Sequence, residues 1–311
     1  MAFLQSLRSL FKGAGPAALP ADLSFGLIDK LGIKPLLEQK QWLAFEKTAA
    51  ELPPDELTRL LDGLCLSEHY APLLTQYQQS GDSEMRRLVA AVYATFRAWE
   101  ARSGAYAREL SQQQVDGFTH YLTQAHAHLA HPFAEPALQA QASARLVRVA
   151  MGLSEPELAQ AAYEQCIALQ PRHLLAHLFY FNVLTPKWFG DEEVLEDFVT
   201  TATPALRDLL QAMYLVELQS IVDDSTAVAK ADFKRANQRR IMELLAQEPR
   251  TEDALAAIYF NNYLACLSHN LGELARRDQF LRVMDGRITV NPWPLFGLSP
   301  QAVRKLSPPA N

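Results

Sequence analysis

Prolines divide the middle of this sequence into segments of nearly constant length. Pro156, Pro171, Pro186 and Pro204 follow one another at intervals of 15, 15 and 18 residues. A proline inside a helix removes a backbone hydrogen bond and clashes with the preceding turn, so these prolines mark helix ends. Helices of three to four turns with short breaks between them pack as antiparallel hairpins. The spacing therefore predicts a series of helical hairpins.

The rest of the sequence is also typical of helices. Leucine and alanine are frequent, β-branched residues are few, and only 13 of 311 residues are glycine, which favours helices over sheets. The leucines of residues 57–64 have helical spacing and follow Asp55, a residue that caps helices well. Similar spacing recurs in residues 84–102, 113–130 and 136–151. We expect an all-α protein.

Composition and charge exclude several classes of protein. Hydrophobic residues make up 49% of the chain and charged residues 21%, so the chain as a whole is neither disordered nor of low complexity. A chain of this length buries enough surface to fold without a disulfide or a metal. The formal net charge of −6 is too small to indicate a partner.

One segment resembles a known repeat. Residues 159–171 carry small side chains at Ala159 and Cys166, an aromatic ring at Tyr163 and a closing proline. This pattern is similar to the second helix of a tetratricopeptide unit, where small residues let two helices approach closely. Pro171 and Pro204 are 33 residues apart, close to the tetratricopeptide period. The resemblance implies antiparallel hairpins stacked as an irregular tetratricopeptide-like α-solenoid.

A second resemblance follows directly on this unit. Residues 184–190, Leu-Thr-Pro-Lys-Trp-Phe-Gly, resemble a Pro-Lys-Trp-Gly-Gly turn of an uncharacterised family of bacterial helical-repeat proteins, with Phe189 in place of a glycine. The resemblance implies a helical-repeat fold and no particular activity. Near the other end, residues 263–284 read as one more helical hairpin. The Pro-Trp-Pro segment at residues 292–294 is expected to cap it, with Trp293 covering apolar surface.

These features suggest three regions. We expect residues 1–20 to form an amphipathic helix or arm and residues 21–131 to form an N-terminal helical region. Residues 132–311 then hold the tetratricopeptide-like repeats and the C-terminal cap. A second place for a division between lobes is the acidic stretch at residues 223–225.

The start of the chain decides the expected compartment. Phe3, Leu7, Leu10 and their apolar neighbours lie on one face of a short helix beside Arg8 and Lys12. Polar residues interrupt this run, so it does not read as a secretion signal. The longest apolar stretch elsewhere, residues 173–186, is too short to span a bilayer. We expect a cytoplasmic protein without a transmembrane segment; weak membrane-surface contact through residues 1–12 is the alternative.

Motifs of the common enzyme classes do not occur in the sequence. It has no phosphate-binding glycine loop, no GxSxG elbow, no HExxH pair and no kinase signature. The cysteines Cys65, Cys166 and Cys266 are about a hundred residues apart, which indicates small buried side chains and not a metal site. We therefore expect no catalytic residue, metal or cofactor.

Two groups of histidines are the basis of an alternative function. His173 and His177 are four residues apart, so they share a helix face as zinc ligands do, but no glutamate lies between them. The second group comprises His120, His126, His128 and His131. We interpret both groups as surface or packing histidines. A helical enzyme or metal-binding protein that uses them stays open as an alternative.

The main prediction is a non-catalytic protein-protein interaction module. A solenoid offers a long concave surface, and aromatic and cationic side chains dominate the energetics of many interfaces. The candidate partner-binding residues are His173, His177, Tyr180, Phe181, Lys187 and Trp188. A cytoplasmic adaptor, or an immunity-type inhibitor that covers a toxin, would act in this way. The partner is a protein whose identity the sequence does not give.

A basic stripe provides a second candidate surface. Its residues are Lys230, Lys234, Arg235, Arg239 and Arg240. Their spacing of four and five residues places them along one helix, with Phe233, Ile241 and Leu244 available for the core. An anionic protein partner would fit this stripe. Nucleic acid is disfavoured because the net charge is negative and no stacking aromatic shares the face.

Overall fold

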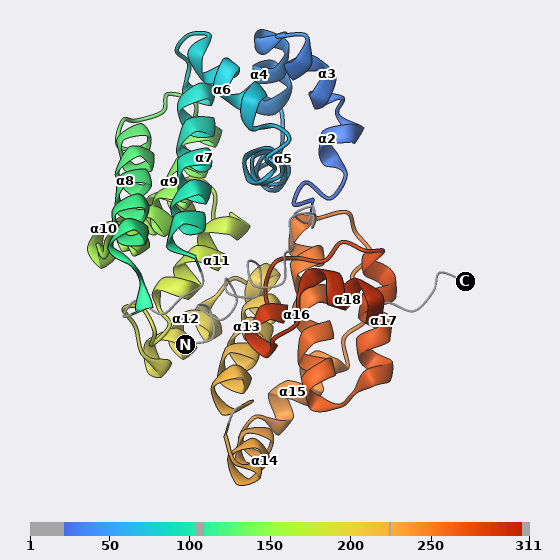
Figure 1. Ribbon diagram of the computed structural model, residues 1–311. Helices are drawn as coiled ribbons and strands as arrows, with labels where there is room; N and C mark the ends of the chain where they lie inside the picture. Colours follow the sequence, from blue (N-terminus) through green and yellow to red (C-terminus); the bar gives the residue numbers. More distant parts are fainter. Residues whose placement is uncertain (1–21, 104–108, 224, 307–311) are drawn as a thin grey trace. The chain divides into compact units, whose positions relative to one another are not determined.

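The computed structural model describes residues 22–103, 109–223 and 225–306, and all the regular structure in these ranges is helical (Figure 1). The prediction of an all-α protein is confirmed. The chain divides into two compact units, which we call the N-terminal unit (residues 22–102 and 110–192) and the C-terminal unit (its described part, residues 103, 109, 193–223 and 225–306). The predicted helix or arm at residues 1–20 lies outside the described residues.

The N-terminal unit contains ten α-helices in its described part. They are α2 (Leu27–Lys30), α3 (Ile33–Glu38), α4 (Trp42–Ala50), α5 (Pro54–Leu66), α6 (Ala71–Gln79), α7 (Glu84–Arg102), α8 (Gln112–Leu129), α9 (Pro136–Leu153), α10 (Pro156–Leu169) and α11 (Leu174–Val183). One apolar core runs from Leu27 in α2 to Val149 in α9. It includes Leu138 and Ala142 of α9, so the predicted boundary between residues 131 and 132 lies inside this unit.

Prolines begin several of these helices, as the sequence predicts. Pro136 and Pro156 occupy first-turn positions of α9 and α10, where the missing N–H costs no helical hydrogen bond. The Glu84 carboxylate accepts hydrogen bonds from the backbone N–H groups of Ala134 (2.6 Å) and Glu135 (3.3 Å), which precede α9. A negative charge at a helix N-terminus is favourable. This side chain of α7 therefore helps to position the start of α9.

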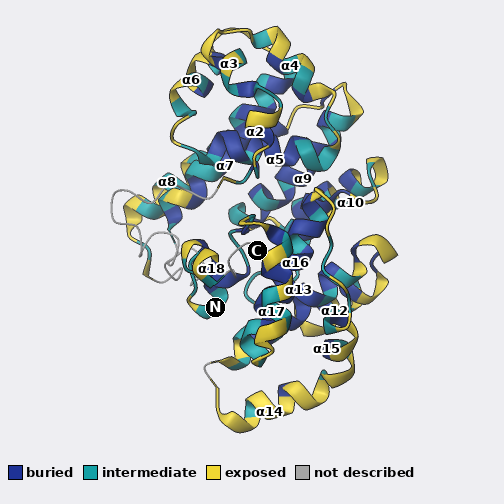
Figure 2. Cartoon of the chain, turned by 90° about the vertical axis from the view of Figure 1, so that its right-hand side faces the viewer, coloured by how far each residue is buried: buried dark blue, intermediate teal, exposed yellow. Residues whose placement is uncertain are grey.

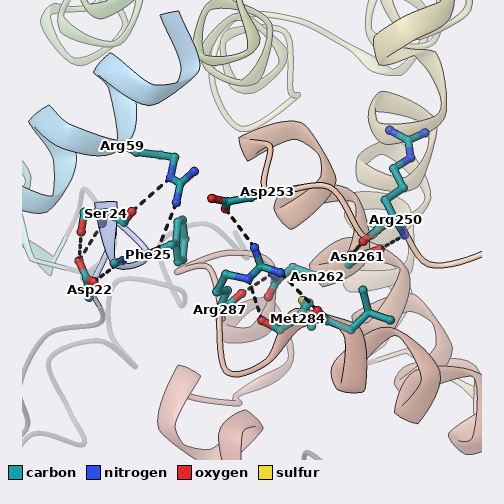
Figure 3. Close-up of polar contacts among 12 residues, drawn as sticks. Asp22, Ser24, Phe25, Arg59, Arg250, Asp253, Asn261, Asn262, Met284 and Arg287 are labelled. Carbon is teal, nitrogen blue, oxygen red and sulfur yellow. Dashed lines mark hydrogen bonds and ion pairs between the residues drawn. The ribbon is translucent and has the colours of Figure 1, made fainter. Parts of the chain in front are cut away.

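A buried arginine joins the first residues of the N-terminal unit to its core. Arg59 in α5 is 2% exposed. Its guanidinium donates to the backbone carbonyls of Ser24 (3.2 Å) and Phe25 (3.3 Å), as Figure 3 shows. Because a buried guanidinium needs acceptors, these two carbonyls hold the start of the unit against α5.

The described part of the C-terminal unit holds the remaining helices. They are α12 (Glu192–Thr201), which begins at the boundary between the units, α13 (Pro204–Asp223), α14 (Ala227–Ala236), α15 (Gln238–Leu245), α16 (Leu255–Leu271), α17 (Leu274–Met284), the 3₁₀-helix η2 (Trp293–Phe296) and α18 (Pro300–Leu306). Buried apolar residues of α13, α16 and α17 form most of its interior. None of the helices in the described ranges combines the length and the apolar character needed to cross a bilayer.

The Pro-Trp-Pro segment packs back onto α16. Trp293 is fully buried, and its indole Nε1 donates to Oδ1 of Asn262 (3.0 Å). The same amide accepts from the backbone N–H of Thr289 (3.1 Å) and donates to the carbonyls of Ile258 (2.8 Å) and Arg287 (3.0 Å). One fully bonded asparagine thus fixes both residues 287–289 and Trp293; Figure 3 shows Asn262 beside Arg287.

Candidate functional site

A compact turn follows α11, and we call residues 184–190 the Trp188 turn. The backbone N–H of Trp188 donates to the carbonyl of Thr185 (2.9 Å), and that of Phe189 donates to the carbonyl of Val183 (3.1 Å). These bonds use carbonyls that the end of a helix would otherwise leave without a partner. The turn is therefore a fixed extension of α11.

Gly190 allows the chain to leave this turn. A Cβ atom at this position would lie 2.1 Å from the carbonyl oxygen of Leu184, which is far inside van der Waals contact. Only glycine permits so close an approach of backbone to backbone. The glycine of the Trp-Phe-Gly sequence is thus a steric requirement of the turn.

The turn places Trp188 on a group of aromatic rings from other helices. Its ring meets Trp99 of α7 edge to face, with centroids 5.9 Å apart and planes at 75°. Trp99 in turn meets Phe118 of α8 at 5.1 Å and 71°. Edge-to-face pairs at such distances are favourable beyond the area that they bury. Three segments far apart in sequence therefore converge at Trp99, which is 3% exposed.

Two guanidinium groups complete this cluster. Arg148 of α9 places its Cζ 4.6 Å from the centroid of Trp99 and 5.1 Å from that of Phe179 in α11. Arg102 at the end of α7 lies 5.9 Å from Trp99 and 5.7 Å from Phe118, and burial lowers its pKa. Cations over aromatic faces are attracted by the ring quadrupole. We call Trp99, Arg102, Phe118, Arg148, Phe179 and Trp188 the aromatic cluster.

The rim of the aromatic cluster is accessible. Trp188 and Lys187 are half-buried, and Phe189 is 39% exposed. The rings of Trp188 and Phe189 have their centroids 6.1 Å apart. A rigid, partly exposed pair of aromatic side chains beside a lysine has the composition of a protein-binding hot spot.

Tyr180 belongs to a separate aromatic stack on α10 and α11. Its ring is nearly parallel to that of Tyr163, with centroids 4.2 Å apart and planes at 7°. His177 meets Tyr163 edge to face at 5.4 Å. Burial raises the pKa of Tyr163 to about 12 and also raises that of Tyr180. Both tyrosines are half-buried, so this stack shows only part of its surface.

His173 lies inside the unit, in a polar network between α5, α9 and α11. Its Nε2 is 2.9 Å from the Gln141 amide, which also bonds Thr58. With its nitrogen turned toward His173, the same amide accepts from Arg145 (3.2 Å) through its oxygen. Arg145 forms an ion pair with Asp62 (2.6 Å). Burial and the nearby Arg145 charge lower the pKa of His173 to about 4, so the imidazole is neutral.

The six predicted partner-binding residues thus separate into two sets. His173, His177 and Phe181 are 1%, 4% and 3% exposed, and their side chains support the fold from inside. Tyr180, Lys187 and Trp188 reach the surface of the unit. Trp188 contacts Trp99 of α7, and Trp99 in turn contacts Phe118 of α8 and Arg148 of α9. Trp99 and Arg102 share a face of α7, but nothing in the sequence relates this face to residue 188.

The basic stripe is divided between two helices, so its prediction as one helix is wrong. Asn237 separates α14 from α15 with φ −106° and ψ 10°, and its side-chain amide donates to the carbonyl of Phe233 (3.1 Å). Asparagine often interrupts helices through such local bonds. Phe233, Ile241 and Leu244 are buried, as predicted.

Carboxylates lie close to most of the stripe. Lys230 pairs with Asp223 (3.3 Å), Arg239 with Glu243 (3.7 Å), Arg235 with Asp232, and Arg240 with Glu196 of α12. Lys234 is exposed. Exposed pairs of this kind are weak, so they reduce the positive potential of the stripe without hiding its side chains.

The other candidate groups show no converging chemistry. Within the described ranges, no three or more His, Cys, Asp or Glu side chains are arranged to hold a metal ion. His120 and His131 are exposed, whereas His126 and His128 are half-buried. The three cysteines are buried thiols, as predicted, and burial raises the pKa of each, that of Cys166 to about 12.

No protein-family model, no curated protein and no solved structure matches this chain.

Proposed function

We propose that this chain is a non-catalytic helical-repeat module that binds a protein partner through the Trp188 turn. An adaptor or an immunity-type inhibitor of the cytoplasm would work in this way. The binding residues are Lys187, Trp188 and Phe189, with Tyr180 at the side. The tetratricopeptide-like pairing of α9 with α10, in which the small side chains of Ala159 and Cys166 are buried, supports the same class of protein.

One observation carries the proposal: Trp188 is both rigid and accessible. Its backbone is fixed by hydrogen bonds, its ring contacts Trp99, and its side chain is half-buried beside Phe189, which is 39% exposed. Binding costs less when the side chains that make contact are already ordered. A half-buried tryptophan whose ring contacts a buried tryptophan is preorganised in this sense.

The test is quantitative binding to a partner captured from the native cell with the intact chain. Phe189→Ser and Lys187→Glu change side chains at the edge of the aromatic cluster and leave its rings in place. Trp188→Ala removes the central contact. We expect Trp188→Ala to weaken binding by about tenfold or more, as truncated hot spots do. Isothermal titration calorimetry with the purified partner measures this change.

The matched control is Leu43→Ser in α4. Leu43 is 80% exposed and belongs to the same unit, so the variant also removes an exposed apolar side chain. We expect it to bind like the unchanged protein. Equal affinities for Leu43→Ser, Phe189→Ser and Trp188→Ala, with folding confirmed by circular dichroism, would contradict the proposal.

A further inference from the structure

Helix α14 is held to the rest of the C-terminal unit by very little apolar contact. Phe233 is its one buried side chain, and Val228 is 68% exposed. Figure 2 shows the helix exposed along almost its whole length. A helix of ten residues is marginal in water unless packing supports it. We therefore expect another molecule to cover the exposed face of α14 in an assembly.

This face is cationic with apolar side chains between the charges. α14 carries Lys230, Lys234 and Arg235 against the single carboxylate Asp232. The adjoining α15 adds the exposed Arg239 together with its ion-pair partner Glu243, and Met242 of this helix is 63% exposed. We call the exposed side of α14 and α15 the basic face. A partner for it has to present carboxylates and apolar groups together.

The same unit presents such a surface on α12. Leu195 and Val199 of this helix are buried, which turns Glu193 and Asp197 outward on the opposite side. Val194 lies between them at 45% exposure. We call this side of α12 the acidic face. It offers two carboxylates around an apolar side chain.

Contacts within one chain join α15, which carries part of the basic face, to α12, which carries the acidic face. Arg240 of α15 forms an ion pair with Glu196 of α12. Tyr214 of α13 donates to the same carboxylate (3.3 Å), so these contacts tie the three helices together. The basic face and the acidic face are complementary in charge. In a dimer with two-fold symmetry, the basic face of each copy meets the acidic face of the other copy.

We propose that the basic face and the acidic face together form the interface of a two-fold symmetric homodimer. The basic face of one copy covers the acidic face of the other, and Val228, Met242 and Val194 become buried between them. Both faces belong to the C-terminal unit, whereas the Trp188 turn belongs to the N-terminal unit. A charge-reversal substitution brings like charges together and strongly disfavours the dimer. Each ion pair across the unchanged interface adds only modest affinity.

The first test is sedimentation velocity of the full chain over a range of concentrations at low salt. We expect a concentration-dependent dimer that weakens as salt rises, because screening acts on exposed charges. Lys234→Glu/Arg235→Glu and Glu193→Lys/Asp197→Lys should each raise the dissociation constant at least about tenfold. Persistence of a monomer up to about 100 μM at low salt, where weak specific complexes form, would overturn the proposal.

Mixing the two variants makes the test specific. The first variant has two acidic faces and the second has two basic faces, so each repels itself and attracts the other. An equimolar mixture should form a heterodimer, which native mass spectrometry distinguishes by mass. If the mixture stays monomeric while the unchanged protein dimerises, the interface lies elsewhere and the assignment is wrong.

Two control variants separate the dimer from general charge effects and from partner binding. Arg282→Glu/Lys305→Glu reverses two exposed charges on α17 and α18 of the same unit and should dimerise normally. Trp188→Ala should also dimerise normally, which keeps this result separate from the partner-binding test. Binding of the monomer to phosphatidylserine vesicles, lost in Lys234→Glu/Arg235→Glu, would instead identify the basic face as a lipid-binding surface and overturn the dimer.

Discussion

At the scale of single residues, the N-terminal unit is specified by buried polar side chains that bond one another. Gln141 is fully buried yet bonds Thr58 and His173, and Arg145 is buried with Asp62. A buried polar group without a partner is costly. These bonds therefore fix the positions of α5, α9 and α11 along one another. Apolar contacts alone would allow these helices to slide.

His173 makes this register sensitive to acid. Burial, with the charge of Arg145, lowers its pKa to about 4, whereas a histidine in the unfolded chain titrates near 6.5. Between these values the unfolded chain binds a proton that the folded chain does not. The free energy of unfolding therefore falls as the pH is lowered from about 6.5 to about 4, by about 3 kcal/mol from this group.

The variant His173→Gln tests this effect. Glutamine keeps a polar group near Gln141 but does not titrate, so we expect the variant to lose that part of the pH dependence. Asp55 acts in the opposite direction, because burial raises its pKa to about 6 and the folded chain then holds a proton that the unfolded chain releases. Urea unfolding at several pH values should be compared with His131→Gln, at an exposed histidine. Equal slopes for both variants would show that His173 is not responsible.

At the scale of helices, the ends of α9 and α16 have the same backbone arrangement with different residues. α9 and α16 both end at a residue in the left-handed region, Ser154 with φ 64° and Gly272 with φ 82°. In both, the next N–H bonds a carbonyl five residues back, at 2.9 Å. This is the Schellman arrangement, for which glycine is the usual residue. The backbone of a serine is strained in this conformation, whereas that of a glycine is not.

A reciprocal pair of substitutions measures this strain. We expect Ser154→Gly to raise the free energy of unfolding by about 0.5 to 1 kcal/mol, and Gly272→Ala to lower it by about 1 kcal/mol. A Cβ atom at Gly272 would meet no atom within 4 Å, so the second change reports backbone conformation alone. Chemical unfolding of both variants gives the two values. A loss of stability in Ser154→Gly would mean that the serine hydroxyl matters more than the strain.

At the scale of the whole molecule, the chain forms two compact units with separate interiors. The C-terminal unit closes on Asn262, which bonds Trp293, Thr289 and two carbonyls. Replacing this side chain leaves several buried polar groups without partners. Because each unit has its own core, the loss is expected to stay within the C-terminal unit.

Hydrogen exchange of the variant Asn262→Leu tests this independence. We expect faster exchange in residues 255–306 and unchanged exchange in α8 to α10, because unpaired buried groups cost about 1 to 3 kcal/mol each. Asn270→Leu is the control on the same helix, since Asn270 is half-buried and bonds mainly within its own turn. Faster exchange in both units of Asn262→Leu would show that the units unfold together.

Sequence alone was enough to predict the helical class, the helical segment from Pro136, the helix breaks at Pro156 and Pro204, and the burial of the cysteines. These properties depend on local chemistry: a proline limits its own backbone, and helical spacing defines an apolar face wherever the chain folds. The break at Asn237 was missed because asparagine also occurs inside helices, and its bond to Phe233 is visible only in the folded chain.

The exposure of the candidate residues follows from the packing of the folded chain and not from local sequence. His173 and His177 are buried, because α5 and α9 pack against α11 on the side where these histidines lie. Trp188 instead rests on Trp99, which is 89 positions earlier in the chain. Periodicity shows that a helix has a buried side; it does not show which distant helix covers that side, because this choice depends on the packing of all the helices together.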